Sequence, residues 1–152
     1  MATPFPFTSG QILTAAQMNS IGELLSFTPT WTCSGTAPAI GNGSLTGSYW
    51  RVQNLIYFII TLTAGSTTTF GTGTFRFNLP LATSSIQRNL GFYAQPLDSG
   101  VAWYTNGYAE GASSSSSTFV VPFTSAGAAY TNAVPFAWGT NDQLIVAGSY
   151  LL

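Results

Sequence analysis

The chain has 152 residues, a length that suits one domain with a substantial core. Only 5% of them are charged, against roughly a quarter in an ordinary soluble domain, and neither lysine nor histidine occurs. Three arginines and a net charge of −1 cannot neutralise a run of phosphates, which argues against nucleic acid as a partner. Without histidine or lysine, a serine or cysteine nucleophile lacks its usual base and zinc lacks its usual ligands, so we expect no metal and no cofactor.

The same composition bears on membranes, disulfides and association. The longest strongly apolar run, residues 55–62, is too short for a membrane-spanning helix of about 20 residues, so we expect no membrane insertion. Cys33 is the single cysteine, and its place inside a predicted strand favours a small buried side chain over a nucleophile. So few charges protect a surface poorly from association. We therefore expect other subunits to cover much of the surface; the alternative is a monomer whose surface is rich in Ser, Thr and Asn.

The first nine residues predict an extended arm. Pro4 and Pro6 fix an extended path and disfavour helix. Phe5 and Phe7 have nothing local to bury them, so we expect the arm to dock on a neighbour or to fold back along its own domain.

Residues 14–25 predict one short helix. Thr14 and Gln17 form a capping-box pattern at its start. Its apolar side chains share one face at helical spacing and are Met18, Ile21 and Leu25. A helix of about three turns is too short to be stable alone in water, so we expect it to pack on the β domain or on symmetry copies of itself.

From residue 28 onward the sequence predicts short strands separated by turns. Alternating apolar and polar residues, rich in β-branched and aromatic types, carry this interpretation. The predicted strands are residues 28–34, 45–52, 55–62, 74–79, 89–95, 101–106, 108–110, 118–123 and 143–151. Tight turns are expected at Asn42-Gly43, Gln53-Asn54 and Asn106-Gly107, and a loop tip at the serine run 113–117.

Two prolines and one doubly apolar strand refine this pattern. Pro80 should end the strand at residues 74–79, and Pro122 should confine residues 118–123 to a sheet edge. Residues 55–62 carry apolar side chains on both faces, so both faces should be covered, by a second sheet, by a neighbouring subunit, or by one of each. Many short strands with frequent turns indicate an all-β fold, a jelly-roll-like antiparallel β-sandwich that follows the arm and the short helix.

Few residues suggest catalysis. Asp98 and Glu110 flank residues 101–106 and could approach each other across a hairpin, as the acid and base of a glycosidase do. No neighbouring residue type is arranged to raise the pKa of either carboxyl, which favours solvated loop charges. Asp142 is better explained as a turn residue before the last strand than as a calcium ligand.

Trp103, Tyr104 and Tyr108 gather around the predicted turn at Asn106-Gly107. Adjacent strand residues point to opposite faces, so one of Trp103 and Tyr104 should lie outside the core. Exposed aromatic rings can stack on sugars, which makes these three candidates for a glycan-binding patch. Packing in the core or in a subunit interface is the alternative.

Several stretches resemble bacteriophage virion proteins. Residues 7–19 (FTSGQILTAAQMN) resemble the segment that opens many tail-fibre and minor tail proteins. A small β module common on phage particles is similar to residues 27–32 (FTPTWT), 41–49 (GNGSLTGSY), 65–80 (GSTTTFGTGTFRFNLP) and 135–150 (PFAWGTNDQLIVAGSY). The similarity covers about half of the chain and consists of turns and aromatic residues; residues 82–134 match no module.

The resemblance implies a non-enzymatic structural protein on the surface of the virion, often a homotrimer. We expect a short tail-fibre or minor tail appendage, or a capsid decoration protein, because no fibre-like repeat is present. Residues 1–27 would dock on other virion proteins or subunits, and residues 28–152 would form the β domain. The expected docking side chains are Phe5, Phe7, Met18, Ile21 and Leu25. Alternative hypotheses are a receptor-binding module for a host-surface glycan and, more remotely, a polysaccharide depolymerase.

Overall fold

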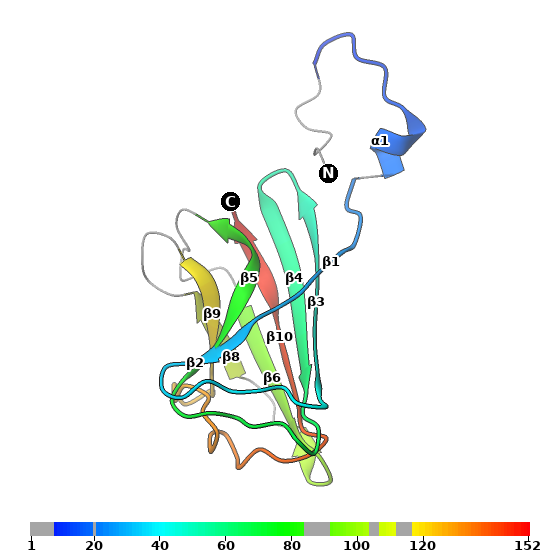
Figure 1. Ribbon diagram of the computed structural model, residues 1–152. Coiled ribbons are helices and arrows are strands. Elements are labelled where there is room, and N and C mark those ends of the chain that lie inside the picture. Colours follow the sequence, from blue (N-terminus) through cyan, green and yellow to red (C-terminus); the bar gives the residue numbers. More distant parts are fainter. Residues whose placement is uncertain (1–7, 20, 84–91, 104–106, 112–116) are drawn as a thin grey trace.

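The computed structural model describes the chain except for residues 1–7, 20, 84–91, 104–106 and 112–116 (Figure 1). One helix, α1, spans Ala15–Asn19, and strands follow it. The strands are β1 (Leu25–Phe27), β2 (Trp31–Cys33), β3 (Ser44–Val52), β4 (Leu55–Thr63), β5 (Phe75–Thr83), β6 (Phe92–Asp98), β7 (Ala102–Trp103), β8 (Gly107–Gly111), β9 (Ser117–Phe123) and β10 (Gln143–Leu151). No helix among the described residues is long and apolar enough to cross a membrane.

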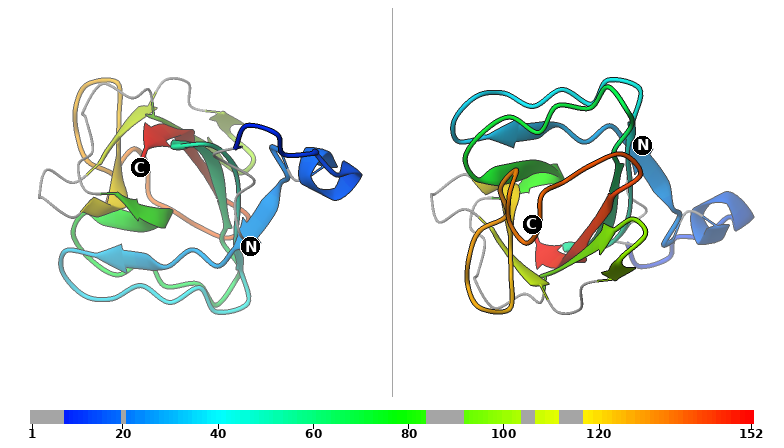
Figure 2. Two further views of the ribbon diagram at one scale, coloured as in Figure 1. Left: turned by 90° about the horizontal axis from the view of Figure 1, so that it is seen from above. Right: turned by 90° about the horizontal axis from the view of Figure 1, so that it is seen from below.

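The strands pair antiparallel in one sheet that curls around a core (Figure 2). Their order is β1-β3-β4-β10-β6-β8-β9-β5-β2, and β7 pairs with β6 beside this path. Curling brings the first and the last strands of this order near each other, so the sheet encloses its own apolar face. The expected all-β, sandwich-like antiparallel fold is confirmed.

A short segment joins the two edges of the sheet. β1 pairs with β3 at one edge, and β2 pairs with β5 at the other. Only residues 28–30 separate β1 from β2 along the chain. Thr30 is held in this crossing by Asn78 of β5, whose side-chain oxygen accepts from the Thr30 hydroxyl at 3.1 Å. Residues 25–33 therefore form a strap across the opening of the curl.

The core lies inside the curl because every second residue of a strand points inward. In β4 the inward side chains are at most 2% exposed and are Ile56, Phe58, Ile60 and Leu62. An aromatic cluster extends the core toward one end, where Trp31 meets Phe75 edge-to-face at 5.1 Å and Phe70 at 5.7 Å. Phe70 comes from a loop, so the loops contribute to the core as well as the strands.

The helix begins as the sequence predicts and ends earlier. Gln17 and Thr14 form a reciprocal capping box, in which the Thr14 amide donates to Gln17 Oε1 at 3.0 Å and the Gln17 amide donates to Thr14 Oγ1 at 3.2 Å. The expectation of a helix over residues 14–25 is wrong beyond Asn19. Gly22 has a φ of +73°, which breaks the helical path, and Leu25 gains ladder pairing in β1 instead.

Pro80 does not end its strand, contrary to the expectation. β5 continues to Thr83, and its pairing with β9 is irregular between Asn78 and Thr83. Beyond Pro80 the buried Tyr150 hydroxyl serves the backbone of Leu81, donating to its carbonyl at 2.8 Å and accepting from its amide at 3.1 Å. The strand passes through the proline because a side chain replaces the missing ladder bonds.

The assignment of residues 118–123 to an edge is also wrong, since β9 lies between β8 and β5. Pairing with β5 involves Ser117, Phe119 and Val120 and does not reach Pro122. The amide that Pro122 lacks is therefore not needed on the β5 side. The Pro122 carbonyl accepts a hydrogen bond from the Tyr130 amide at 2.9 Å.

The expected tight turn at Asn106-Gly107 is a third correction. β7 and β8 both pair antiparallel with β6, so these two strands run in the same direction, and the chain reverses before β7. The reversal is the turn around Gly100, whose φ is +87°. Gly107 lies in β8, where an added Cβ would stand 2.6 Å from the Phe123 carbonyl and 2.7 Å from that of Ala94. Close approach of three strands, not a turn, explains this glycine.

Candidate functional site

An apolar groove of about 350 Å³ crosses the outer face of the sheet over β4, β10 and β6. Tyr57 of β4 and Tyr93 of β6 line it on either side of β10. Between them β10 contributes only small residues, Ala147, Gly148 and Ser149. The groove is thus a shallow channel with aromatic walls and a small-residue floor.

One wall of the groove is a stacked pair of rings. Trp50 of β3 lies opposite Tyr57 in register, with ring centroids 5.2 Å apart and planes 13° apart. Both side chains are more than one-third exposed, and Tyr93 on the other wall is 47% exposed. The rings of Trp50 and Tyr57 support each other by stacking, and all three rings present apolar surface to water.

The apolar surface continues around the curl through cross-strand neighbours. Ile59 of β4 pairs with Ala147, Ala147 with Tyr93, and Tyr93 with Tyr108 of β8. Tyr108 in turn stacks on Phe123 of β9 at 5.3 Å and 11°. We call this surface the aromatic face; its members are Trp50, Tyr57, Ile59, Tyr93, Tyr108 and Phe123.

The doubly apolar strand was the sequence signal for this face. Its inner side chains are buried as expected, whereas Tyr57 and Ile59 on the outer side are 38% and 37% exposed in a single chain. Coverage of that outer side by another subunit stays a prediction. Trp50 and Tyr93 were not selected from the sequence, because their partners across the strands depend on a register that the sequence does not state.

The three aromatic residues chosen as glycan candidates do not all fall within the described part. Tyr104 lies outside it. Trp103 ends β7, opposite Leu97 of β6, and its side chain is not described. Tyr108 is 36% exposed and belongs to the aromatic face. Of the three, only Tyr108 has a described ring that is accessible to a ligand.

The expected docking residues divide in a similar way. Phe5 and Phe7 lie outside the described residues. Met18 and Ile21 are exposed, at 52% and 37%. Leu25 is half-buried in β1 and faces Tyr49 across the ladder, so it belongs to the sheet and not to a helix face. The division between an N-terminal attachment segment (1–27) and a β domain (28–152) stays a prediction, although residues 25–27 pair with β3.

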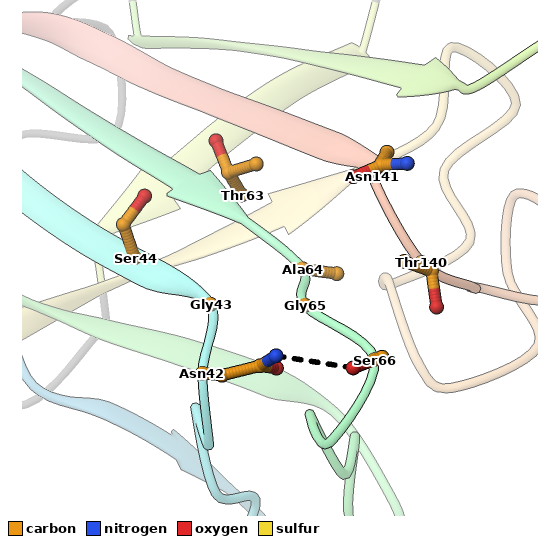
Figure 3. Close-up of a pocket in the computed structure, with 9 residues that line it drawn as sticks. All are labelled: Asn42, Gly43, Ser44, Thr63, Ala64, Gly65, Ser66, Thr140 and Asn141. Atoms are coloured by element: carbon orange, nitrogen blue, oxygen red, sulfur yellow. Dashed lines mark hydrogen bonds between the residues drawn. The ribbon is translucent and has the colours of Figure 1, made fainter.

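A second hollow, of about 310 Å³, is polar and lies where β3, β4 and β10 meet the loops at one end of the sheet (Figure 3). Asn42 closes one side, with Nδ2 donating to the Ser66 hydroxyl at 3.0 Å and Oδ1 accepting from the Thr67 amide at 2.9 Å. Gly65 lets the two loops touch, since a Cβ there would stand 2.2 Å from Asn42 Oδ1. The Asn42 side chain is committed to joining these loops, which explains its place in a turn.

The carboxylates do not form a catalytic pair within one chain. Ala109, the neighbour of Glu110, lies opposite Phe92 at the start of β6, whereas Asp98 ends that strand. Six residues of strand separate them, about 20 Å, beyond the roughly 5–9.5 Å of glycosidase pairs. The possibility that they meet across a hairpin is therefore wrong. Asp142 is 3% exposed and accepts from the amides of Ser99 and Gly139 at 2.8 and 2.6 Å, a structural role in a turn.

Cys33 at the end of β2 is half-buried, and its thiol donates to the Phe70 carbonyl at 3.4 Å. Burial raises the pKa of this thiol, while the charge of Arg76 lowers it in part. A raised pKa disfavours the thiolate that a nucleophile requires. Within the described residues, no three His, Cys, Asp or Glu side chains gather as metal ligands.

Comparison with known proteins adds one structural likeness. No protein-family profile matches the chain, and no curated protein matches its sequence. The fold is similar to part of the crystal structure of the Dettilon tailspike protein (gp208), with a TM-score of 0.50 and 16% identity. The match covers 85% of this chain and 23% of the tailspike chain. This chain thus has a β fold that also occurs as a segment of a much longer tailspike.

Proposed function

We propose that the protein is a non-enzymatic structural protein of a bacteriophage particle, a short tail appendage that assembles as a homotrimer. Residues 1–27 attach it to other virion proteins, and the β domain lies at the particle surface. The likeness to a segment of a tailspike supports this role and favours the tail over the capsid. That likeness is the observation that carries the proposal.

The N-terminal segment supports attachment. Its apolar side chains stand in water in a single chain; those more than half exposed are Ile12, Met18 and Leu24. Monomeric proteins rarely expose contiguous apolar patches, and a group of exposed apolar side chains on one segment marks a site of interaction. The segment precedes the sheet and stands clear of it (Figure 1), as an attachment element requires.

Deletion of residues 1–24 tests the attachment. The cut spares β1, so the shortened chain should keep its β circular dichroism and its cooperative unfolding. It should no longer copurify with phage particles when it is supplied to a lysate that lacks the full-length protein. A shortened chain that still copurifies would contradict the proposal.

The non-enzymatic assignment has its own test. Asp98→Asn and Glu110→Gln remove the two carboxylates first considered for acid–base chemistry. Purified protein should release no reducing sugar from bacterial envelope polysaccharides, with or without these substitutions. Release that either substitution abolishes would establish a depolymerase instead.

A host-surface glycan receptor is the second candidate function, and Tyr108 favours it. Its exposed ring is fixed in orientation by stacking on Phe123, a geometry suited to the apolar face of a sugar. Binding on an array of bacterial envelope glycans, lost in Tyr108→Ala and in Trp103→Ala but kept in Val101→Ala, would support it. Absence of binding to every glycan on the array would count against this function.

A further inference from the structure

The large apolar side chains exposed in the described part of the chain gather in two places. Apart from Val101, they lie either on the segment before β1 or on the outer face of the sheet. We call residues 8–24 the arm; its members in this set are Ile12, Leu13, Met18, Ile21 and Leu24. Each of these two surfaces lacks cover in a single chain, and each is present in every copy of the chain.

The dimensions of the two surfaces match. The walls of the groove, Tyr57 and Tyr93, stand on strands two positions apart, about 10 Å at the usual strand spacing. A helix with its side chains is about 10 Å wide. The small residues of β10 between the walls allow another backbone to approach closely, which is how a helical turn seats in a groove.

Charge favours the same partner. Glu23 is the only charged residue of the arm, and the groove itself is lined by none. A strongly charged partner would lose hydration on this face without gaining an opposite charge. An uncharged apolar segment suits the groove, and the arm is such a segment.

The position of the arm directs it toward a second copy. Leu25 pairs with Tyr49, so the arm leaves the sheet edge beside Trp50 and the groove. From there it extends away from its own sheet in the views of Figures 1 and 2, and α1 stands apart from the curl. A copy alongside would present its own groove to this arm.

We propose that the arm of one copy docks on the aromatic face of a second copy, with the α1 turn and its Met18 and Ile21 side chains seated in the groove. Each copy gives one arm and receives one, and such head-to-tail contacts form a ring when the rotation between neighbouring copies closes, as the proposed homotrimer requires. This deepens the proposed function, because it assigns Met18 and Ile21 to contact between subunits and leaves residues 1–7 free to reach the particle.

Paired cysteines test the contact in purified protein. In a Cys33→Ser background, Met18→Cys is placed in one tagged copy and Ser149→Cys in a differently tagged copy, and the two are co-expressed and mildly oxidised. A reducible species that carries both tags is expected. In the control, Ser66→Cys replaces Ser149→Cys; Ser66 is exposed and lies beyond the far end of β4. The control should give at least tenfold less of the doubly tagged species. Equal yields from the two would overturn the proposal.

A chain that carries both cysteines separates exchange from folding back. Exchange predicts covalent species of two or more chains on a non-reducing gel. An arm folded on its own groove predicts a covalent monomer, and that result would overturn the proposal.

Solution mass gives a second readout that does not depend on cysteine geometry. Met18→Ser changes only the arm and Ile59→Ser only the outer face, and each should lower the oligomer to a single chain at micromolar concentration. Val101→Ser removes an exposed side chain outside both surfaces and should leave the mass unchanged. A monomeric wild-type protein, or an oligomer that survives both substitutions, would overturn the docking. Neither assay uses particles, so the failure of attachment and the failure of arm exchange are distinguishable.

Discussion

The Tyr150 side chain stabilises the fold through both its ring and its hydroxyl. Its ring is fully buried, and it contacts Phe58 and Phe92 edge-to-face at 5.9 and 6.4 Å. Its hydroxyl serves both backbone groups of Leu81, where Pro80 has interrupted the ladder between β5 and β9. The hydroxyl of Tyr150 in β10 thus supplies hydrogen bonds to β5 where Pro80 interrupts the backbone pairing.

Tyr150→Phe should therefore lower the free energy of unfolding. The substitution keeps the ring and leaves the amide and the carbonyl of Leu81 without a partner, which costs about 1–3 kcal/mol. Urea unfolding measures the change. Tyr93→Phe, on an exposed ring, is the matched control and should stay within about 0.5 kcal/mol of the wild type. Equal effects from the two would show that the Leu81 contact contributes nothing.

Alkaline pH should weaken the fold through two buried phenols. Burial raises the pKa of Tyr130 and of Tyr150 to about 12 from the ordinary value of 10. The unfolded chain therefore loses these protons at lower pH than the folded one, so stability is intact below about pH 10 and falls as the pH rises toward 12. Urea unfolding at several pH values checks the slope. A variant with both Tyr130→Phe and Tyr150→Phe should show a smaller fall, and an unchanged fall would contradict the assignment.

At the scale of elements, the strap of residues 25–33 depends on a glycine in its neighbour. Gly47 of β3 faces Phe27 of β1, and an added Cβ would stand 2.4 Å from the Phe27 ring and 2.7 Å from Pro29. The missing side chain leaves room for the aromatic ring to lie across β3. The packing of β1 thus requires a residue with no side chain at this position.

Gly47→Ala should destabilise the protein by about 1–3 kcal/mol, because the ring and the proline must move together. The free energy of unfolding from urea denaturation measures this cost. Ser26→Ala changes an exposed side chain of β1 itself and should have almost no effect. If the two variants behaved alike, the crowding at Gly47 would not matter.

The sequence predicted the long hairpins better than the short elements. Residues 45–52 and 55–62 correspond closely to β3 and β4, with the expected two-residue connection at Gln53-Asn54, because alternation and turn residues are local signals. β1 was missed, since three residues carry no periodicity and depend on pairing with β3. The predicted helix was too long because Leu25 has the spacing of a helical face in the sequence, whereas in the structure it pairs with Tyr49 of β3.

The aromatic face was only partly predictable. The doubly apolar character of residues 55–62 indicated a covered outer side, which led to Tyr57 and Ile59. Tyr93 joined them only through the central position of β10 between β4 and β6, a long-range pairing that no local pattern encodes. The grouping of Trp103 with Tyr108 assumed a hairpin between them, whereas β7 and β8 both pair antiparallel with β6.

At the scale of the whole molecule, the scarcity of charge predicts association. The mass in solution, by light scattering after gel filtration, should lie near three times 16.0 kDa. Raised salt should leave that mass unchanged, because apolar contacts and not ion pairs join the subunits. A clean monomer would contradict the trimer and return attention to Tyr108 and Trp103 as parts of a freely folding receptor-binding module.

The strap also determines how the domain would carry mechanical load. Tension on the arm enters the sheet at Leu25 and is borne by the short pairing of β1 with β3, then three residues later by β2 on β5 at the opposite edge. The pairing of β1 with β3 therefore resists the load first, and the pairing of β2 with β5 resists it after β1 has detached. The two edges of the same sheet resist one pull in sequence.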